Sequence, residues 1–367
     1  MSISQYLPAL KIGDLTLRLP ILQGGMGVAI SMANLASAVA NEGGLGVIAT
    51  AGACYLEPDR STNYREANIR GLRRQIQDAR SKSSGALGVN IMAALTNCDE
   101  LARVAVEEGV DVIVSGAGLP MSLPACRIEG RRVKLIPIVS SGRAAAILAR
   151  RWMERFDYLP DAFVVEGPLA GGHLGFRPEQ IEDPDYALDK LIVQVLDVTE
   201  KLDTKYGKRI PVIAAGGVYT GADIRHFLNL GASGVQMATR FVTTHECDAA
   251  EAFKQAYIHA KAEDLVIIQS PVGLPGRAIR NDFTDAIKEG RKAAYTCPFH
   301  CIVTCDEHNS PYCIAQALLN ACRGNFRAGF AFAGANAWRA TEIISVKETM
   351  RRIQEEYSQS APVQPVG

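Results

Sequence analysis

Eight short apolar runs alternate with longer amphipathic stretches between residues 19 and 261 of this 367-residue chain. Apolar runs without polar alternation are typical of parallel strands that are covered on both faces. We expect strands at 19–23, 45–50, 86–92, 110–118, 134–141, 161–167, 210–217 and 234–241. We expect the helices that follow them at 31–43, 67–81, 98–109, 121–130, 142–156, 185–204, 221–231 and 248–261.

Eight consecutive β/α units match the size of a (β/α)8 TIM barrel, an α/β fold. The alternative, a doubly wound open sheet, would usually carry a G-x-G-x-x-G fingerprint after its first strand, and "GGMGVAI" does not fit this fingerprint. We therefore expect a TIM barrel over residues 1–260. The alternation of strands and helices does not continue in residues 261–367. These residues predict a C-terminal, mixed and mostly helical extension packed on the barrel, with a final helix at 345–357.

The charge and hydropathy of the chain narrow the classes of partner. The formal net charge is zero and the isoelectric point is about 7.0, which gives no electrostatic argument for nucleic acid or an anionic membrane. No apolar run reaches the roughly 18 residues of a membrane span. The N-terminus has neither the basic start nor the apolar core of a signal peptide. We expect a cytoplasmic protein with a small-molecule substrate, and its oligomeric state stays open, a homodimer being one alternative.

In a TIM barrel, the active site lies at the C-terminal ends of the strands. In this chain those ends are rich in glycine, small polar side chains and backbone donors, and poor in charge. Such a composition suits a flat cofactor with a phosphate better than a metal ion. The loops after strands seven and eight often bind phosphate, and there Gly216 and Gly217 would let amide groups converge on an anion. Thr239 follows one unit later.

The segment "EGPLAGGHLGF" (166–176) places His173 between glycines at the end of the sixth expected strand. Imidazole ionises near neutral pH, so it can accept or donate a proton during catalysis. A structural histidine is the alternative, but a structural histidine rarely needs glycine on both sides at this end of a strand. We therefore predict a direct role for His173.

Several motifs together resemble one known family. "PILQGGMGVAIS", "EGGLGVI", "EGPLAGGHLGF", "IPVIAAGGVYTGADI", "GVQMATRF" and "SPVGLPGRAI" are similar to the nitronate monooxygenase (2-nitropropane dioxygenase) family, which also contains FMN-dependent enoyl-acyl-carrier-protein reductases. The resemblance covers residues 15–280 and implies FMN bound without a covalent link, with His173 as the catalytic residue. The cofactor-binding residues that it implies, together with strand-end residues, are Gly24, Gly25, Met26, Asn90, Ser140, Glu166, Ala170, Gly171, Gly172, Gly216, Gly217, Gln236, Met237 and Thr239.

The resemblance leaves two reactions open. A nitronate monooxygenase oxidises alkyl nitronates with oxygen to a carbonyl compound and nitrite, and His173 would bind the anion or deprotonate a nitroalkane. An enoyl-acyl-carrier-protein reductase would use NAD(P)H as a transient donor, which needs no Rossmann motif in this family. A flavin-binding or phosphate-ligand-binding protein without turnover is a third alternative. The whole set of motifs favours nitronate oxidation.

Five of the nine cysteines lie between residues 297 and 322, beyond the reach of the resemblance. Four thiolates, Cys297, Cys301, Cys305 and Cys313, could hold an iron–sulfur cluster or zinc. The spacing of the first three also forms one stripe of a helix, on which Cys297 and Cys305 would stand about 12 Å apart. Metal binding therefore requires an irregular segment. We expect buried packing, with no metal, and a disulfide as a minor alternative.

Overall fold

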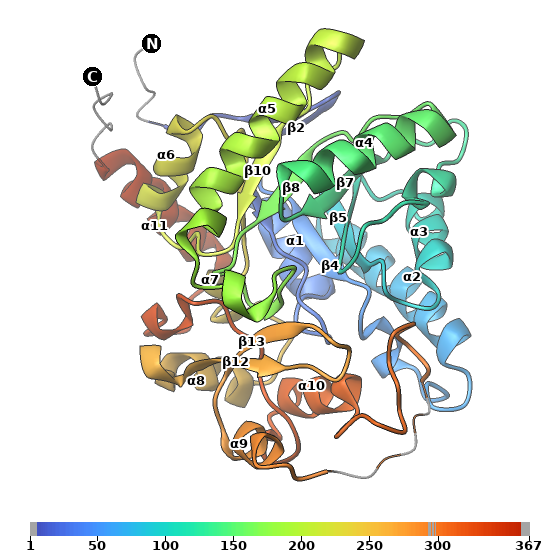
Figure 1. Ribbon diagram of the computed structural model, residues 1–367, viewed down its shortest axis with the longest axis vertical. Coiled ribbons are helices and arrows are strands. Elements are labelled where there is room, and N and C mark those ends of the chain that lie inside the picture. The colour runs from blue at the N-terminus through green and yellow to red at the C-terminus, as the bar shows by residue number, and fades with distance from the viewer. Residues whose placement is uncertain (1–5, 293–294, 296, 298, 361–367) are drawn as a thin grey trace.

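Eight parallel strands form a closed barrel in the computed structural model, which describes residues 6–292, 295, 297 and 299–360 (Figure 1). Leu22 and Leu45 form a parallel bridge that joins the first strand to the second and closes the sheet. The TIM barrel prediction is confirmed. The strands are β3 (Ile21–Gln23), β4 (Gly46–Ala49), β5 (Leu87–Met92), β6 (Val112–Gly116), β7 (Lys134–Val139), β8 (Phe163–Glu166), β10 (Val212–Ala215) and β11 (Gly234–Met237).

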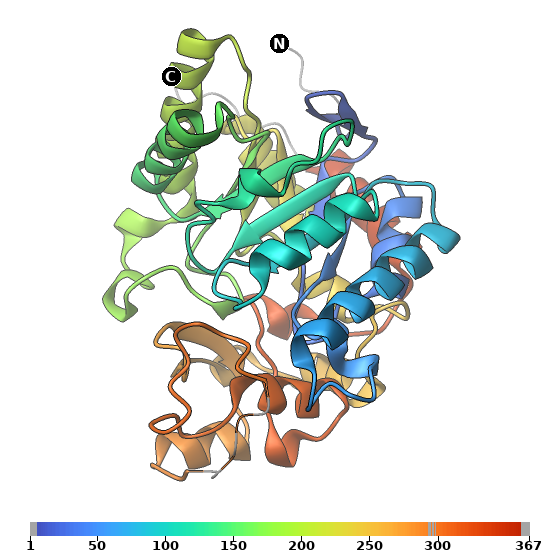
Figure 2. The ribbon, with the colours of Figure 1, turned by 90° about the vertical axis from the view of Figure 1, so that its right-hand side faces the viewer.

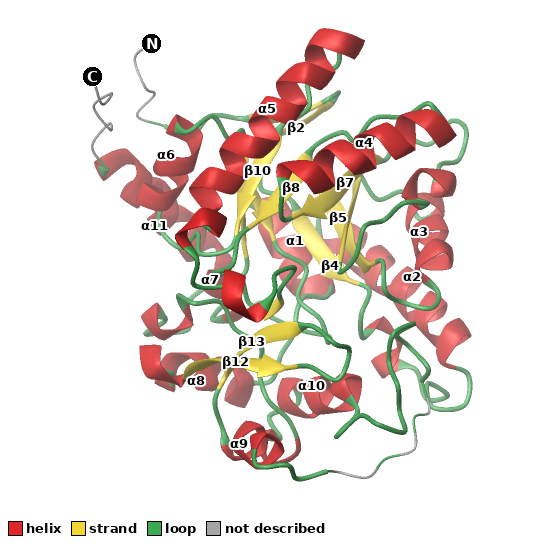
Figure 3. Cartoon of the chain, viewed as in Figure 1, coloured by secondary structure: helices red, strands yellow, loops and turns green. Residues whose placement is uncertain are grey.

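Helices that follow the strands cover the outside of the barrel, drawn in red in Figure 3. They are α1 (Ala33–Asn41), α2 (Tyr64–Lys82), α3 (Cys98–Glu107), α4 (Gly142–Phe156), α5 (Leu188–Tyr206) and α6 (Gly221–Asn229). The helix expected at 121–130 is wrong, because only a 3₁₀ turn, η2 (Leu123–Cys126), forms there. Pro124 lacks a backbone N–H and Gly130 has a φ of +77°, so neither supports a longer α-helix.

The eighth helix of the barrel does not follow the eighth strand. The expected helix at 248–261 exists as α8 (Glu251–His259), but it packs on the turn η7 (Ala337–Arg339) outside the barrel. After β11 comes only a short helix, α7 (Thr239–Val242), and α11 (Val346–Gln359) packs on α6 and α1. Gly221 permits this contact, because a Cβ there would lie 2.1 Å from the Tyr357 nitrogen.

The two ends of the barrel are covered differently. At the N-terminal end, the hairpin of β1 (Leu10–Ile12) and β2 (Leu15–Leu17) places its buried leucines in the same apolar cluster as the interior of the barrel. At the C-terminal end lies the extension, below the barrel in Figures 1 and 2. It contains β12 (Leu265–Gln269), β13 (Pro275–Ile279), α9 (Asp282–Lys288) and α10 (Ile314–Cys322).

The extension is joined to the barrel by a small antiparallel sheet. β13 pairs with β12 on one side and on the other with β9 (Gly172–His173), which belongs to the loop after the sixth barrel strand. The extension therefore contacts the catalytic end of the barrel through the segment that carries His173. A boundary at 260/261 stays a prediction, because the chain beyond it supplies both this cover and α11.

The helical stripe considered for the cysteine-rich segment is wrong. In the described part of residues 289–313, the backbone forms turns and one isolated bridge, with no helix between α9 and α10. All nine cysteines are free thiols. Among the described residues, no helix combines the length and apolar character that a membrane span requires.

Candidate functional site

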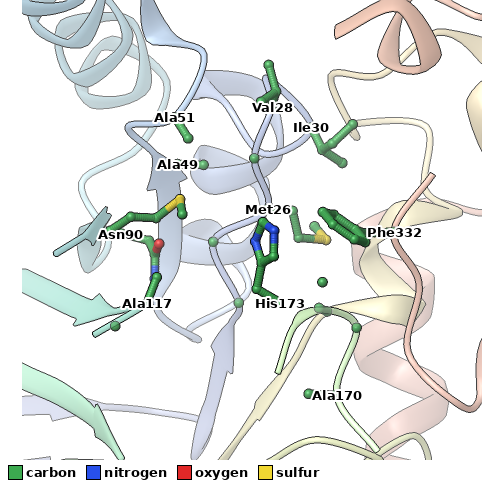
Figure 4. A pocket seen from close by; sticks show the side chains of 18 of the residues that line it. Met26, Val28, Ile30, Ala49, Ala51, Asn90, Ala117, Ala170, His173 and Phe332 are labelled. Atoms are coloured by element: carbon green, nitrogen blue, oxygen red, sulfur yellow. The ribbon is translucent and has the colours of Figure 1, made fainter. Parts of the chain in front are cut away.

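A cavity of about 280 Å³ lies between the C-terminal ends of the barrel strands and the extension (Figure 4). Strand ends from around the barrel contribute to its wall, and the extension forms the opposite wall. The cavity gathers most of the residues that were predicted for the site: Gly24, Gly25, Met26, Asn90, Glu166, Ala170, Gly171, Gly172, His173, Gly216, Gly217, Gln236 and Thr239.

Two predicted residues, Met237 and Ser140, do not line the cavity. Successive side chains of a strand point to opposite faces, so Gln236 faces the cavity while Met237 packs in the core between strands and helices. Met237 contributes through its backbone, where its carbonyl accepts a hydrogen bond from the Gly24 N–H at 2.8 Å. The Ser140 hydroxyl lies behind the loop, 2.7 Å from where a Cβ on Gly175 would stand.

His173 is held between the barrel and the extension. Its Nε2 lies 2.7 Å from the Ser270 hydroxyl, and its ring meets the Phe332 ring edge-on, with 5.0 Å between centroids. Figure 4 shows the imidazole beside Phe332 and Met26. Burial lowers the pKa of His173 to about 4, because the low-dielectric site disfavours the cation. The imidazole is therefore neutral at pH 7 and able to accept a proton.

Arg277 fixes the loop that leads to His173. Arg277 is 9% exposed, and its guanidinium donates to two backbone carbonyls of the loop, Pro168 O at 2.9 Å and Ala170 O at 3.3 Å. Gly171 lets the same loop dock on the extension, because a Cβ at this position would lie 2.5 Å from the carbonyl carbon of Ala333. The position of His173 thus depends on residues more than 90 positions away in the chain.

The backbone at the end of β3 passes very close to the end of β5. A Cβ at Gly25 would stand 2.2 Å from the Asn90 Cβ, a distance that no side chain can adopt. The Asn90 side chain lies against this backbone and reaches the cavity. Glycine at position 25 therefore leaves a bare strip of main chain in the cavity wall, which a flat ring can approach closely.

On the wall formed after β10 and β11, backbone groups and small polar side chains converge. Gly216 and Gly217 have φ values of +89° and +94°, a conformation that favours glycine. The Asn336 amide donates to Gly217 O at 2.6 Å, and Thr239 lies beside Gly334. Within the described part of the chain, the buried Gln236 Oε1 has no hydrogen-bond partner. A buried acceptor of this kind needs a ligand or water donor.

Glu166 places a carboxyl group at the end of β8, in the cavity wall. Burial raises its pKa to about 7, since the site disfavours the anion. Within the described residues, no hydrogen bond or ion pair to the Glu166 carboxyl group offsets the cost of burying its anion. Near neutral pH it therefore exists as a mixture of acid and carboxylate, and it can donate or accept a hydrogen bond from a ligand.

We predict that Glu166→Gln becomes more stable relative to the wild type as the pH rises. The folded wild type keeps a proton that the unfolded chain releases above 4.5, so its free energy of unfolding falls between pH 4.5 and about 7. The difference between variant and wild type should grow by up to about 3 kcal/mol over this interval. Urea unfolding at several pH values measures it. The exposed Glu182→Gln serves as the control, and equal pH dependence in both variants would contradict the prediction.

Sequence reasoning missed four residues that complete the site. Ser270 stands in the quoted "SPVGLPGRAI" segment, which also contains Arg277, but no role was inferred for either. Phe332 and Asn336 lie in "AFAGANAW" (331–338), a run of small residues around one glycine that has the same composition as the strand ends. That composition was the available signal. Their proximity to His173 and Gly217 follows only from the path of the extension across the mouth of the barrel.

Comparison with known proteins agrees with this geometry. The chain is 30% identical to a dehydrogenase of a hydroxylated octahydroindene carboxyl-CoA from Mycobacterium tuberculosis over 75% of its length, a match that spans 66% of that relative. It is 28% identical to a "Probable nitronate monooxygenase" from Staphylococcus aureus, with 75% of this chain and 79% of the relative covered. FabK from Thermotoga maritima has a similar structure, with a TM-score of 0.71, 29% identity and 94% of each chain covered.

These relatives indicate an oxidoreductase with the same architecture over nearly the whole chain. The sequence profile described as "Nitronate monooxygenase" matches residues 9–356, which include all eight barrel strands, His173 and the extension. The chain belongs to the nitronate monooxygenase family.

Proposed function

We propose that the protein is an FMN-dependent oxidoreductase whose cofactor lies across the mouth of the barrel, with His173 as the residue that transfers the substrate proton. The observation that carries the proposal is the position of a neutral, buried imidazole beside a glycine-lined wall. Enzymes of this family generally use a flavin, and the residues present fit this group. The bare backbone at Gly25 suits a flat ring, and the unpartnered Gln236 Oε1 suits a ligand with hydrogen-bond donors.

The cavity wall divides into two parts for such a cofactor. Gly24, Gly25 and Met26 would contact the ring, with Asn90 at its polar edge and the Ala170–Gly172 backbone beside it. The part around Gly216 and Gly217 would hold the phosphate, with Thr239 and the newly found Asn336 nearby. Glu166 would contact a polar group of the cofactor or substrate. Ser140 would act only from behind the loop, and Met237 only through its backbone.

The chain supplies orientation and proton transfer, whereas FMN when bound supplies reversible acceptance of one or two electrons. The hydrogen bond between Ser270 and Nε2 fixes the ring of His173, which leaves Nδ1 as the nitrogen that exchanges a proton with the substrate. Phe332 covers the ring and limits access of water. The lowered pKa keeps His173 unprotonated at neutral pH, so Nδ1 is free to accept a proton.

Nitronate oxidation is the reaction that we favour. A neutral His173 can deprotonate a nitroalkane at the carbon that carries the nitro group, and the resulting nitronate is then oxidised with oxygen to a carbonyl compound and nitrite. The family profile and the Staphylococcus aureus relative support this substrate class.

A second candidate is redox chemistry on an acyl thioester, with NAD(P)H as a transient donor. The observation that favours it is an apolar section of the cavity wall, formed by Tyr55, Tyr64, Ile314 and Leu318, that could accept an acyl chain. The relative from Mycobacterium tuberculosis is named as the dehydrogenase of a carboxyl-CoA compound, which is an acyl thioester.

Anaerobic reduction of the purified yellow protein separates the candidates. We expect rapid bleaching with an alkyl nitronate, oxygen consumption on admission of air, and little reaction with NAD(P)H. Bleaching by NAD(P)H followed by reoxidation with an enoyl thioester would instead establish the second candidate. A protein that binds no FMN would contradict both, and would leave a flavin-independent binding protein.

A further inference from the structure

The cysteine-rich segment meets a condition for metal binding that the sequence left open. On a helix, Cys297 and Cys305 would be too far apart to serve one centre, but the described residues of this segment form turns. Cys297 and Cys301 are each 9% exposed, and Cys313 packs against the same buried cluster. Irregular backbone between the cysteines allows their sulfurs to converge, so the helical objection no longer applies.

Three of the four thiols belong to one apolar cluster: Cys297 and Cys301 lie in its buried part, and Cys313 packs against it. The fourth, Cys305, closes a turn in which its N–H donates to Ile302 O at 3.2 Å, and Ile302 packs against the same cluster. Free cysteine is often just a small buried residue. Four thiols within 17 residues, three of which share one cluster, are not scattered core residues.

The stretch around Cys301 is hydrogen-bonded to the barrel. Thr96 donates from its backbone to Cys301 O at 3.1 Å, and Val303 donates to Ala94 O at 2.9 Å, so this stretch runs beside the loop after β5. The His300 N–H donates to Cys297 Sγ at 3.3 Å, a contact that stabilises a thiolate ligand. Cys301 therefore lies on backbone that is anchored to the barrel.

The surroundings of the thiols are apolar and close to the functional site. Phe299 meets the rings of Tyr55 and Tyr64 at centroid distances of 6.1 Å and 5.7 Å, in the same apolar cluster as Cys297 and Cys301. Cys301 also lines the cavity at the mouth of the barrel, together with both tyrosines. A centre held by these thiols would therefore be shielded from water and would adjoin the cavity.

The required distance between donor atoms differs between a single zinc and an iron–sulfur cluster. A single zinc with Zn–S bonds of 2.3 Å needs sulfurs about 3.8 Å apart. Among the described residues, the potential metal ligands whose donor atoms all lie within 4.8 Å of one another are Cys297, His300 and Glu307, and not three of the cysteines. That group has an exposed histidine and leaves three thiols unexplained. The cysteines of a [4Fe–4S] cluster bind different irons, so their sulfurs stand further apart than those around one zinc.

We propose that Cys297, Cys301, Cys305 and Cys313 bind a [4Fe–4S] cluster beside the cavity. This replaces the expectation of simple packing, which depended on a helix that does not form. Because Cys301 belongs both to this site and to the cavity wall, the cluster would adjoin the redox site rather than a distant surface. The proposal does not depend on the proposed function, since iron and sulfide are measured without substrate.

The test is the iron and acid-labile sulfide content of the full chain, purified anaerobically and reconstituted with ferrous iron and sulfide. We expect about four of each per chain, and an EPR signal after reduction with dithionite. Cys305→Ser and Cys313→Ser should lower the iron content by about tenfold or more, whereas Cys98→Ser, a half-buried thiol outside the segment, should retain it.

Three results would overturn the proposal. One equivalent of zinc without sulfide would assign the site to Cys297, His300 and Glu307. Wild-type protein that takes up neither iron nor sulfide would show that the thiols serve only as buried packing residues. Unchanged iron in both serine variants would place the cluster elsewhere. If these variants fail to fold, as judged by their circular dichroism, the wild-type content decides the question alone.

Discussion

His173→Ala should lower kcat/KM by about 10²–10⁴-fold while FMN remains bound. The imidazole lies at the cavity and is neutral at pH 7, so its loss removes the base but not the glycine-lined wall that would hold the cofactor. Steady-state kinetics with a nitroalkane, whose carbon-bound proton the base must remove, together with the flavin absorbance of the purified variant, measure both quantities. Turnover that is unchanged would assign the histidine a structural role.

The pH profile and a neighbouring variant sharpen this prediction. Since the pKa of His173 is lowered to about 4, protonation of this residue should not limit the wild type above about pH 5. Ser270→Ala removes the hydroxyl that orients Nε2 and keeps the base. It should therefore cost less activity than His173→Ala. A larger loss in Ser270→Ala would indicate that the hydroxyl, and not the imidazole, contacts the substrate.

Gly25→Ala should abolish most FMN binding and destabilise the protein by about 1–3 kcal/mol. The added methyl group would stand 2.2 Å from the Asn90 Cβ, so either the backbone strip or the asparagine must move out of position. Flavin content after dialysis and urea unfolding measure the two effects. Gly24→Ala is the folding control, because its nearest neighbour would be 3.4 Å away, an ordinary contact.

A double variant tests the cause of this effect. Asn90→Gly removes the two atoms nearest to a Cβ at position 25 and leaves Val47 Cγ1 at 3.3 Å, and it also removes an amide expected at the cofactor. If the clash is the cause, Gly25→Ala combined with Asn90→Gly should bind FMN as well as Asn90→Gly alone. A further loss in the double variant would show that glycine at position 25 is needed for contact with the ring itself.

The fold was predictable because its signals are local. Each barrel strand is a short apolar run next to an amphipathic stretch, and both patterns can be read over about ten residues. The glycines of the site and His173 were found in the same way, since the C-terminal end of a strand is also a local position. The order of elements along the chain did not predict that α11, rather than α8, takes the place of the eighth barrel helix. The buried face of α11 consists of Val346, Thr349, Met350, Ile353 and Tyr357. Helix α8 also has a buried apolar face, so the two patterns do not reveal which helix packs on the barrel.

The amino-acid sequence by itself determined the barrel, the strand ends that form the cavity and the histidine among them. Only the tertiary structure decided which residues face these strand ends across the cavity. The pairing of His173 with Ser270, the cover by Phe332 and the clamp of Arg277 join segments about 100 to 160 residues apart. The cluster proposed for the four thiols likewise depends on turns whose sequence pattern resembled a helix. Periodicity reports which face of one element is buried, whereas the choice of its partner depends on packing across the whole molecule.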